Sequence, residues 1–336
     1  MFDIITFGSA TWDIFIKPKN FQKVIDKKRF ITGKGICFNL GSKVEISDIF
    51  FSSGGGGTNT ATTFAKQGFK TAYCGSVGDD LAGQEIINEL KTLDVDTQFV
   101  SKTKLKATNH SVVLTALKDD RTIFVYRGAS EILGKKDIPW KGLKAKWFYL
   151  APLSGKLCSI TEDIVNFVYK NRIKIAINPG NCQLFLPEKT LKKIIGKVDI
   201  LILNQEEASL LTKIPYQEEK EIFKKIDEIC PGITIMTKGP KGVVVSDGKY
   251  LYRAKPPKSK VVDRTGAGDS FASGFISGFI RSKSNITDAI QVGIANATSC
   301  LKKLGAKNGL LEKVKKIPKV KIQKELCSKN NLCLPH

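Results

Sequence analysis

The chain has 336 residues, 42% of them hydrophobic, which suffices for one large buried core, and no apolar run approaches the ~20 residues that a membrane span needs. The net charge is +22, yet only seven of the 54 basic residues are arginine, and the lysines are spread over the whole chain. Because nucleic-acid sites favour the arginine fork and interleaved aromatic rings, this pattern indicates a solvated lysine-rich surface and argues against a nucleic-acid or membrane partner.

The N-terminal part of the chain predicts strands, a glycine-rich turn and two helices. The opening "DIITFGSATWDIFI" joins an apolar run to a glycine break, which is typical of a buried strand and a turn. Residues 17–51 are strand-like and end in the alternating "KVEISDIFFS". "SGGGGTNTATTFAKQG" predicts a turn and a helix that ends at Gly68; "KTAYCGSVG" predicts a strand and "DDLAGQEIINELKTLDV" a helix.

Further along the chain, strands and helices alternate. Residues 110–126 indicate a hairpin that turns near Asp119 and Asp120. Helices are expected near 159–171, 188–195, 217–229 and 286–303, with apolar strands between them. Strands separated by helices predict an α/β fold in which a parallel sheet is covered on both faces.

Three segments lie outside this alternation. The polar segments near 15–52 and 100–127 are expected to form one small sheet that acts as a lid over the ligand crevice. The lysine-rich residues 311–336 are expected to be a peripheral tail of a single domain that spans residues 1–310.

The cysteines and the start of the chain indicate a reducing compartment. The eight cysteines have no disulfide-framework spacing, so free thiols are expected. Cys327, Cys333 and His336 fit no zinc pattern, and the only other histidine, His110, lies in a predicted strand. The start "MFDIITFG" lacks a basic leader, so we expect a cytoplasmic protein.

The stretch "VVDRTGAGDSFASGF", residues 261–275, carries the strongest chemical signal. Gly266, Ala267 and Gly268 let backbone amides approach an anion, and a helix expected to start near Ser270 adds its unpaired N–H groups. Asp269 lies among those amides, so we expect it to be ionised with a lowered pKa. Such a carboxylate can accept a hydroxyl proton in phosphoryl transfer; its alternative role is to cap the helix.

Together with "GGGGTNTATTFAKQGFKTAYCGSVGDD", this stretch resembles the two signatures of the ribokinase-like, or PfkB, family of carbohydrate and nucleoside kinases. The resemblance runs from about residue 3 to 311 and implies a three-layer α/β/α fold with a mostly parallel central sheet and a small β lid. It implies a kinase that uses ATP and Mg²⁺ to phosphorylate a hydroxymethyl group of a sugar, with Asp269 as base and Gly266–Gly268 as anion hole. A nucleoside or a sugar phosphate is the alternative acceptor, and a non-catalytic ligand sensor is the alternative from another class.

The resemblance also implies roles for residues outside this stretch. It assigns the substrate to Asp13, Gly55, Gly56, Asn59 and Arg127, and the nucleotide to Asn204, Thr237, Gly239, Gly242 and Asn296. Glu207 would hold Mg²⁺ through water, although Asn204 and Glu207 also fit a helix capping box. Asp263 and Thr265 match positions that bind a monovalent cation such as K⁺ in relatives, but Arg264 departs from the commoner threonine between them.

The sequence leaves the acceptor open. A sugar phosphate would suit Lys17, Lys34 or Arg127, and the base of a nucleoside would suit Trp12, Phe15, Phe38 and Phe51. Because exposed strand edges tend to pair, a homodimer through the lid is also expected.

Overall fold

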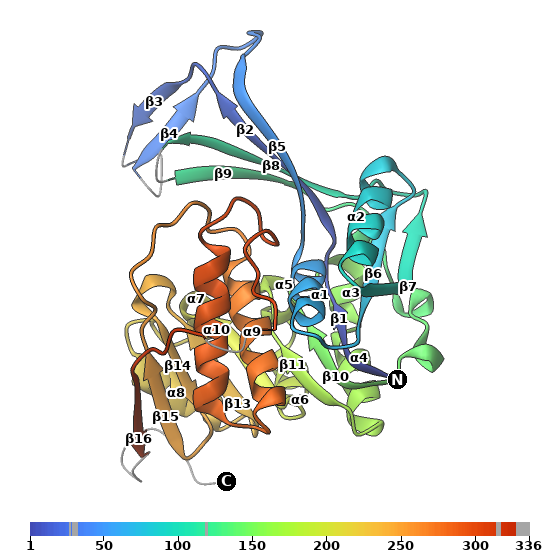
Figure 1. Cartoon of the computed structure of the whole chain (residues 1–336), viewed down its shortest axis with the longest axis vertical. Coiled ribbons are helices and arrows are strands. Elements are labelled where there is room, and N and C mark those ends of the chain that lie inside the picture. The colour runs from blue at the N-terminus through green and yellow to red at the C-terminus, as the bar shows by residue number, and fades with distance from the viewer. Residues whose placement is uncertain (27, 29–32, 118–119, 314–316, 327–336) are drawn as a thin grey trace.

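The centre of the molecule is a sheet of ten strands, seen in a computed structural model that describes residues 1–26, 28, 33–117, 120–313 and 317–326 (Figure 1). In spatial order the strands are β16 (Ile322–Leu326), β15 (Tyr250–Ala254), β14 (Val243–Ser246), β13 (Ile233–Thr237), β12 (Ile200–Asn204), β11 (Lys174–Ile177), β10 (Ala145–Leu150), β1 (Phe2–Phe7), β6 (Thr71–Gly78) and β7 (Val95–Thr103). The seven strands from β13 to β7 are parallel, whereas β14, β15 and β16 are added antiparallel.

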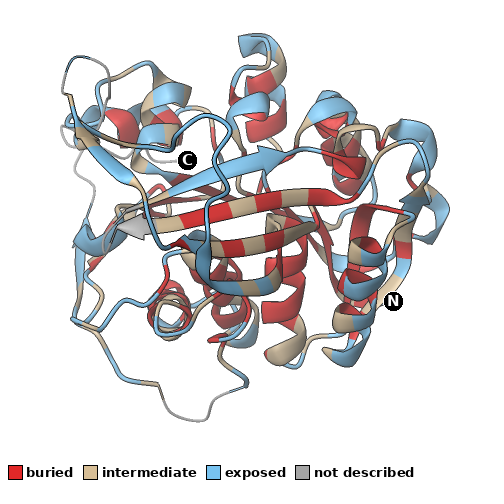
Figure 2. Ribbon diagram, turned by 90° about the horizontal axis from the view of Figure 1, so that it is seen from above, coloured by how far each residue is buried: buried red, intermediate tan, exposed pale blue. Residues whose placement is uncertain are grey.

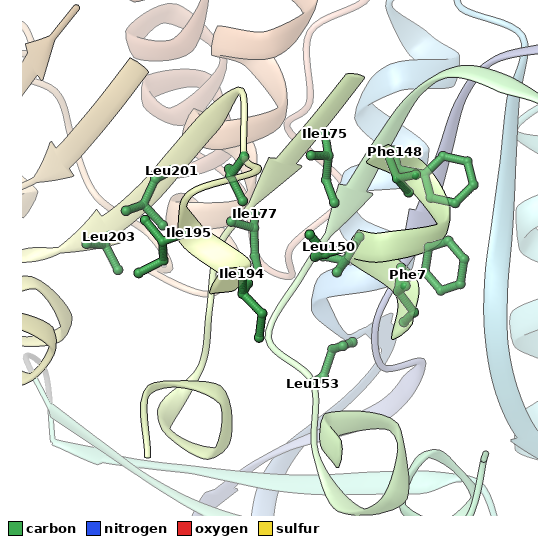
Figure 3. Close-up of a cluster of buried hydrophobic side chains, with 14 of the residues drawn as sticks. Phe7, Phe148, Leu150, Leu153, Ile175, Ile177, Ile194, Ile195, Leu201 and Leu203 are labelled. Carbon is green, nitrogen blue, oxygen red and sulfur yellow. The ribbon is translucent and has the colours of Figure 1, made fainter. Parts of the chain in front are cut away.

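Helices cover both faces of this sheet and create the three layers. They are α1 (Gly56–Lys66), α2 (Leu81–Thr92), α3 (Gly155–Ser159), α4 (Thr161–Lys170), α5 (Asn181–Leu184), α6 (Glu188–Ile195), α7 (Gln205–Thr212), α8 (Glu219–Asp227), α9 (Ala267–Arg281) and α10 (Ile286–Cys300). The core on one face contains side chains of α3, α4, α6, α7 and α8, and Figure 3 shows Ile194 and Ile195 of α6 beside the strand residues Ile177 and Leu201. The other face packs against α1, α9 and α10. Burial on both faces explains why the strands are nearly continuous apolar runs.

The lid is a separate mixed sheet with the order β5-β2-β8-β9. Its strands are β5 (Ile46–Gly54), β2 (Thr11–Pro18), β8 (Asn109–Leu117) and β9 (Asp120–Tyr126); β2 runs parallel to β8 and the other pairs are antiparallel. A two-stranded ribbon, β3 (Gln22–Ile25) and β4 (Lys34–Cys37), extends it. In Figure 2 the edge strands β5 and β9 are mostly exposed, and the central strands β2 and β8 are more buried.

The two predicted lid segments therefore do meet in one sheet, with one change of boundary. Residues 95–103 belong to the large sheet, where they pair with β6, so the second lid segment begins at Asn109 and not near residue 100. Asp119, at the predicted turn of the hairpin, lies outside the described residues.

Part of the lysine-rich C-terminal segment belongs to the large sheet. The sequence predicts a peripheral tail after residue 310, but β16 pairs with β15 at the sheet edge. Val320 and Ile322 pack against the core beside α10, and the Gln291 amide forms hydrogen bonds of 2.8 Å to both the N–H and the carbonyl of Val320. The apolar residues are too few among the lysines to give a strand pattern. Cys327, Cys333 and His336 lie outside the described residues.

One pair of cysteines differs from the prediction of free thiols. Cys158 and Cys182 form a disulfide between α3 and α5. These helices follow the adjacent parallel strands β10 and β11, whose carboxyl ends lie side by side, so the two residues meet although 24 positions separate them. No helix in the described parts of the chain is long and apolar enough to cross a membrane.

Candidate active site

Two cavities lie on either side of the N-terminus of α9. The smaller one, of about 260 Å³, lies against the lid and is lined by Ser9, Thr11, Asp13, Gly55, Gly56, Asn59, Asn109, Ser111, Val125, Arg127, Thr265, Gly266 and Asp269. The larger one, of about 410 Å³, is lined by Asn204, Thr237, Gly239, Pro240, Gly242, Val243, Pro256, Val261, Arg264, Ala267, Gly268, Phe271, Ile294, Ala297, Thr298 and Leu301. After the ligands that the family resemblance implies for their residues, we call them the acceptor cavity and the nucleotide cavity. Residues 264–269 contribute to the walls of both cavities. A chemical group that moves from one cavity to the other therefore passes this stretch.

Gly266 and Gly268 lie at this junction, and the absence of a side chain has a different consequence at each position. Gly266 precedes α9 with φ of +71°, and a Cβ there would lie 2.4 Å from the Cβ of Ala306. Gly268 has no positive φ, and no atom outside its chain neighbours and the adjacent helix backbone lies within 4 Å of the position that its Cβ would take. The helix starts at Ala267, three residues before the predicted start, so Gly268 belongs to its first turn, where N–H groups have no intrahelical partner. This arrangement leaves open space beside unpaired amides, which suits an anion.

Asp269 is oriented by α1 across the crevice. Its Oδ2 accepts a 2.8 Å hydrogen bond from Nδ2 of Asn59, and Oδ1 faces Gly56, where a Cβ would come within 3.5 Å. Among the described residues its carboxylate accepts no hydrogen bond from the N–H groups of α9, which argues against the helix-cap alternative. The buried Oδ1 of Asn59 has no hydrogen-bond partner among the described residues.

The expectation of a lowered pKa for Asp269 is wrong. Loss of hydration raises the pKa of this carboxyl, and the hydrogen bond from Asn59 lowers it by less. A higher pKa makes Asp269 a stronger base once it is ionised.

Asp13 lies near the start of β2, at the end of the lid that faces the acceptor cavity. The Ser111 hydroxyl donates to its Oδ1, and the Cβ position of Gly54 is only 2.1 Å from its Oδ2, so no larger residue fits there without moving Asp13. Asp13 is 6% exposed, and burial raises its pKa to about 6, partly offset by the Ser111 hydrogen bond. An acceptor hydroxyl that donates to this carboxylate would replace the lost hydration.

A buried lysine near Asp13 was not anticipated from the sequence. Lys307, in the loop after α10, is 3% exposed, and its Nζ donates to Ser53 Oγ at 2.5 Å and to Glu89 Oε2 at 3.1 Å. Burial lowers its pKa, and the nearby charges of Glu89 and Asp13 oppose that change. Its charge in turn lowers the pKa of Asp13. Nothing in "GAKNG" distinguishes this lysine from the many exposed ones.

The nucleotide cavity brings together four of the five residues expected there: Asn204, Thr237, Gly239 and Gly242. The fifth residue, Asn296, does not line this cavity, so its assignment to the nucleotide was wrong. Its side chain is fully buried, where Nδ2 donates to Ser270 O at 2.8 Å and Oδ1 accepts from Leu311 N at 2.8 Å. It holds helices together and points away from the cavity, which its neighbour Ala297 lines instead.

Glu207 lies at the start of α7, below the carboxyl end of β12. It forms the capping box with Asn204, through 2.8 Å bonds in both directions, and Nδ2 of Asn178 approaches its Oε2 at 3.4 Å. Burial raises its pKa, and the charge of Asp269 adds to the effect. Asn178 was missed because a single asparagine after a strand carries no motif.

The carboxylates near Glu207 can be compared with the Mg²⁺ that the family resemblance implies. Glu207 and Asp269 are two carboxylates that burial desolvates, and the charge of Asp269 raises the pKa of Glu207, so a cation near Glu207 would be favoured. Within the described residues there is no cluster of three or more acidic, histidine or cysteine side chains that would enclose a metal. Mg²⁺ commonly keeps several waters and takes one or two carboxylates together with substrate phosphates, so this donor set fits it.

The expected monovalent-cation position holds a side chain instead. Arg121 of β9 reaches Asp263 and Thr265 through its Nη1 atom, at 2.7 Å from Asp263 Oδ1 and from Thr265 Oγ1. Both oxygens of Asp263 accept further hydrogen bonds from backbone N–H groups, of Thr265 and Gly305. The residues present therefore do not fit a K⁺ site.

The aromatic residues considered for a nucleoside base lie mostly outside the acceptor cavity. Trp12 is on the opposite face of β2 from Asp13 and packs towards α2, with Phe51 stacked on it at 6.4 Å between ring centroids. Phe15 is buried against Phe50, and Phe38 is outside the lid sheet. Of the basic residues considered for a substrate phosphate, Arg127 lines this cavity; Lys17 and Lys34 are not among the residues that line it.

Comparison with known proteins finds extensive sequence similarity. The family model for pfkB family carbohydrate kinases matches residues 29–313. A ribokinase of Lactococcus lactis subsp. lactis is 30% identical over 274 residues, covering 81% of this chain and 87% of the relative. A cytidine kinase of Thermococcus kodakarensis is 26% identical over 255 residues, covering 75% and 88%.

Solved structures share the fold. The structure of Arabidopsis thaliana ribokinase complexed with ribose and ATP has a TM-score of 0.75 at 22% identity, over 92% of this chain and 96% of that one. A Burkholderia thailandensis nucleoside kinase in complex with inosine has a TM-score of 0.72 at 15% identity, over 92% and 95%. The predicted three-layer α/β/α architecture with a β lid is confirmed.

Proposed function

The chain belongs to the pfkB family of carbohydrate kinases, and we propose that it transfers the γ-phosphate of ATP to a hydroxymethyl group of a sugar. One observation carries the assignment of the site: Asp269 and the first turn of α9 lie between a polar cavity under the lid and a second cavity beside "TKGPKG". The first is the size of a small polyol, and the second is lined by apolar side chains suited to an adenine ring.

The site residues have distinct roles in this proposal. Asp13 and Asn59 bind substrate hydroxyls, with Gly55, Gly56 and Arg127 around them. Asn204, Thr237, Gly239 and Gly242 surround the nucleotide. When bound, Mg²⁺ supplies positive charge that offsets the phosphate oxygens, and Glu207 is the residue that would hold it through water.

The reaction is an in-line displacement. The acceptor oxygen attacks the γ-phosphorus, a new O–P bond forms while the bond to the bridging oxygen of ATP breaks, and ADP leaves with that electron pair. Asp269 accepts the proton of the acceptor hydroxyl. The N–H groups of the first turn of α9, beside Gly268, offset the charge on the transferring phosphoryl group. The protein supplies positioning and charge, which is what this reaction requires.

The acceptor cavity favours a sugar over the two alternatives. Asp13, Asn59, Asn109 and Ser111 give it mostly hydrogen-bonding walls. The aromatic residues that a nucleoside base would contact point elsewhere, and Arg127 is a single cation where a phosphate would attract several. Since its donor is ATP, we also propose that the protein is cytoplasmic.

The first test is ADP release from Mg-ATP with a panel of pentoses, hexoses, their phosphates and nucleosides. Turnover with one or more free sugars is expected. Turnover confined to nucleosides or to sugar phosphates would replace the proposed acceptor, and no turnover by folded protein would favour a ligand sensor.

Gly268→Ala tests the anion hole without disturbing the fold. Beyond its own helix backbone, its Cβ meets no protein atom within 4 Å, so the unfolding temperature should stay the same or rise slightly. Because that space is proposed to hold the phosphoryl group, kcat/KM should fall about 10²-fold. Gly134→Ala is the matched control, since a Cβ there comes no nearer than 3.6 Å to other atoms and lies outside both cavities. Equal loss in both variants would refute the role of Gly268.

We also propose a homodimer through the outer face of the lid. Phe51, Ile14, Val112 and Phe124 form a row across the four strands on the face away from the acceptor cavity, and the two phenylalanines are 49% and 59% exposed. A two-fold axis through such a patch buries it against its own copy. Light scattering should give a dimer for wild type and for Tyr169→Glu, which changes an exposed aromatic of α4, and a monomer for Phe124→Glu. A monomeric wild type would exclude this interface.

A further inference from the structure

The lid contributes a positive charge to the loop that precedes the anion hole. Arg121 is on β9, and strand alternation places it on the same face as Ile123 and Val125. Val125 lines the acceptor cavity, so this face of β9 points to the body of the protein. Figure 1 shows β9 lying above the end of α10 and the loops around α9. From there Arg121 reaches Asp263 and Thr265, 142 and 144 residues further along the chain.

The contact is suited to a permanent charge. Asp263 is 8% exposed, and a carboxylate at such a depth needs a positive partner or several donors. Nη1 of Arg121 lies 2.7 Å from Asp263 Oδ1, and the Thr265 hydroxyl donates to the same oxygen at 2.8 Å. Gly305 N donates to Oδ2 at 2.9 Å. The guanidinium thus adds a positive charge to the hydrogen-bond donors that Thr265 and Gly305 direct at Asp263.

The same contact fixes the position of the anion hole. The backbone of Thr265 continues directly into Gly266, and both residues line the acceptor cavity. A guanidinium bound to the Thr265 hydroxyl and to Asp263 therefore ties the lid to the loop whose amides meet the phosphoryl group. Arg121 itself is not among the residues that line either cavity, so it acts through the loop and not on the substrate.

We propose that Arg121 is a positioning residue that takes the place of a monovalent cation at Asp263 and Thr265, which makes the kinase independent of K⁺ and couples lid placement to the anion hole. The proposal rests on the kinase function stated above. It predicts that an added alkali cation is without effect in wild type and becomes beneficial only when the guanidinium is removed.

The first experiment compares wild type, Arg121→Ala, Arg121→Lys and Thr122→Ala in the chlorides of potassium, sodium and tetramethylammonium. Thr122 is the matched control, because it is the exposed neighbour of Arg121 on the opposite face of β9. Wild type and Thr122→Ala should have equal kcat in all three salts. Arg121→Ala should lose about 10- to 100-fold in kcat with little change in KM for ATP, and potassium should restore part of the loss. Arg121→Lys, which keeps the charge, should lie between them.

Three outcomes overturn the proposal: potassium stimulation of wild type, an unchanged kcat in Arg121→Ala, or a loss of kcat in that variant that accompanies unfolding and is not restored by potassium.

The second experiment needs no substrate. Thermal unfolding in potassium and tetramethylammonium chloride should show a potassium-specific rise in Tm for Arg121→Ala and none for wild type. The same rise in wild type, or its absence in the variant, also overturns the proposal. If no acceptor were phosphorylated, the kinase function would fail while these Tm values would still decide the role of Arg121.

Discussion

Replacement of Asp269 by asparagine is expected to lower kcat by about 10²–10⁴-fold, the usual contribution of a positioned proton acceptor. Asparagine keeps the size of the side chain and can still contact Asn59, but it cannot take the hydroxyl proton. The nucleotide cavity is lined by other residues, so KM for ATP should change little. Steady-state kinetics with the accepted sugar measures both quantities.

Asp288→Asn is a matched control for Asp269→Asn. Asp288 occupies the third position of the 15-residue helix α10, as Asp269 does in the 15-residue helix α9, so the substitution removes a charge from the same helical position at an exposed site. Asp288→Asn should keep wild-type kcat. Comparable losses in both variants would mean that the acid serves the helix and not the chemistry.

The raised pKa of Asp269 gives this prediction a pH dependence. Because burial favours the protonated form, the fraction of enzyme with an ionised base should begin to fall at a pH above the ordinary value of about 3.9. The acid side of the kcat profile should show this fall in wild type. A profile of the same shape in Asp269→Asn would assign the titration to another group.

Features that depend on local patterns were predictable from the sequence. Alternation of apolar and helical segments predicted the parallel sheet, and the helix expected near 188–195 coincides with α6. The two signatures placed Asn59 and Asp269 at one site, and the structure joins them by a hydrogen bond across 210 residues. Motifs succeed here because a backbone conformation and a short spacing are encoded locally.

Features that depend on tertiary contacts were not predictable. Arg121 is one charge in "KDDRTIF", and nothing local indicates that its partner is Asp263. Asn296 differs from the cavity residue Ala297 by one helical step of about 100°, which decides between the core and the cavity. The pKa of Asp269 was predicted with the wrong sign because desolvation is set by the residues that surround the carboxyl, and the sequence does not list them.

Asp13→Asn should weaken substrate binding and at the same time increase the stability of the fold. Removal of a charged hydrogen-bond acceptor in the acceptor cavity should lower kcat/KM for the sugar about 10- to 100-fold, mainly through KM. The stability should rise at pH 8, because the folded protein then keeps a desolvated carboxylate ionised. The pKa of Asp13 is raised from 3.8 to about 6, which corresponds to a gain on the order of 1 to 3 kcal/mol when that charge is absent.

The sign of the pH effect follows from proton uptake. Between the unfolded value of 3.8 and the folded value of about 6, the folded state binds more protons, so this group makes wild type less stable as the pH rises through that range. Below about pH 4 the group is protonated in both states, and the difference between wild type and Asp13→Asn should vanish. Urea unfolding at pH 4 and pH 8 measures it. A variant less stable than wild type at pH 8 would contradict this prediction. It would show that the ionised Asp13 carboxylate stabilises the fold by holding Lys307 and the lid in place.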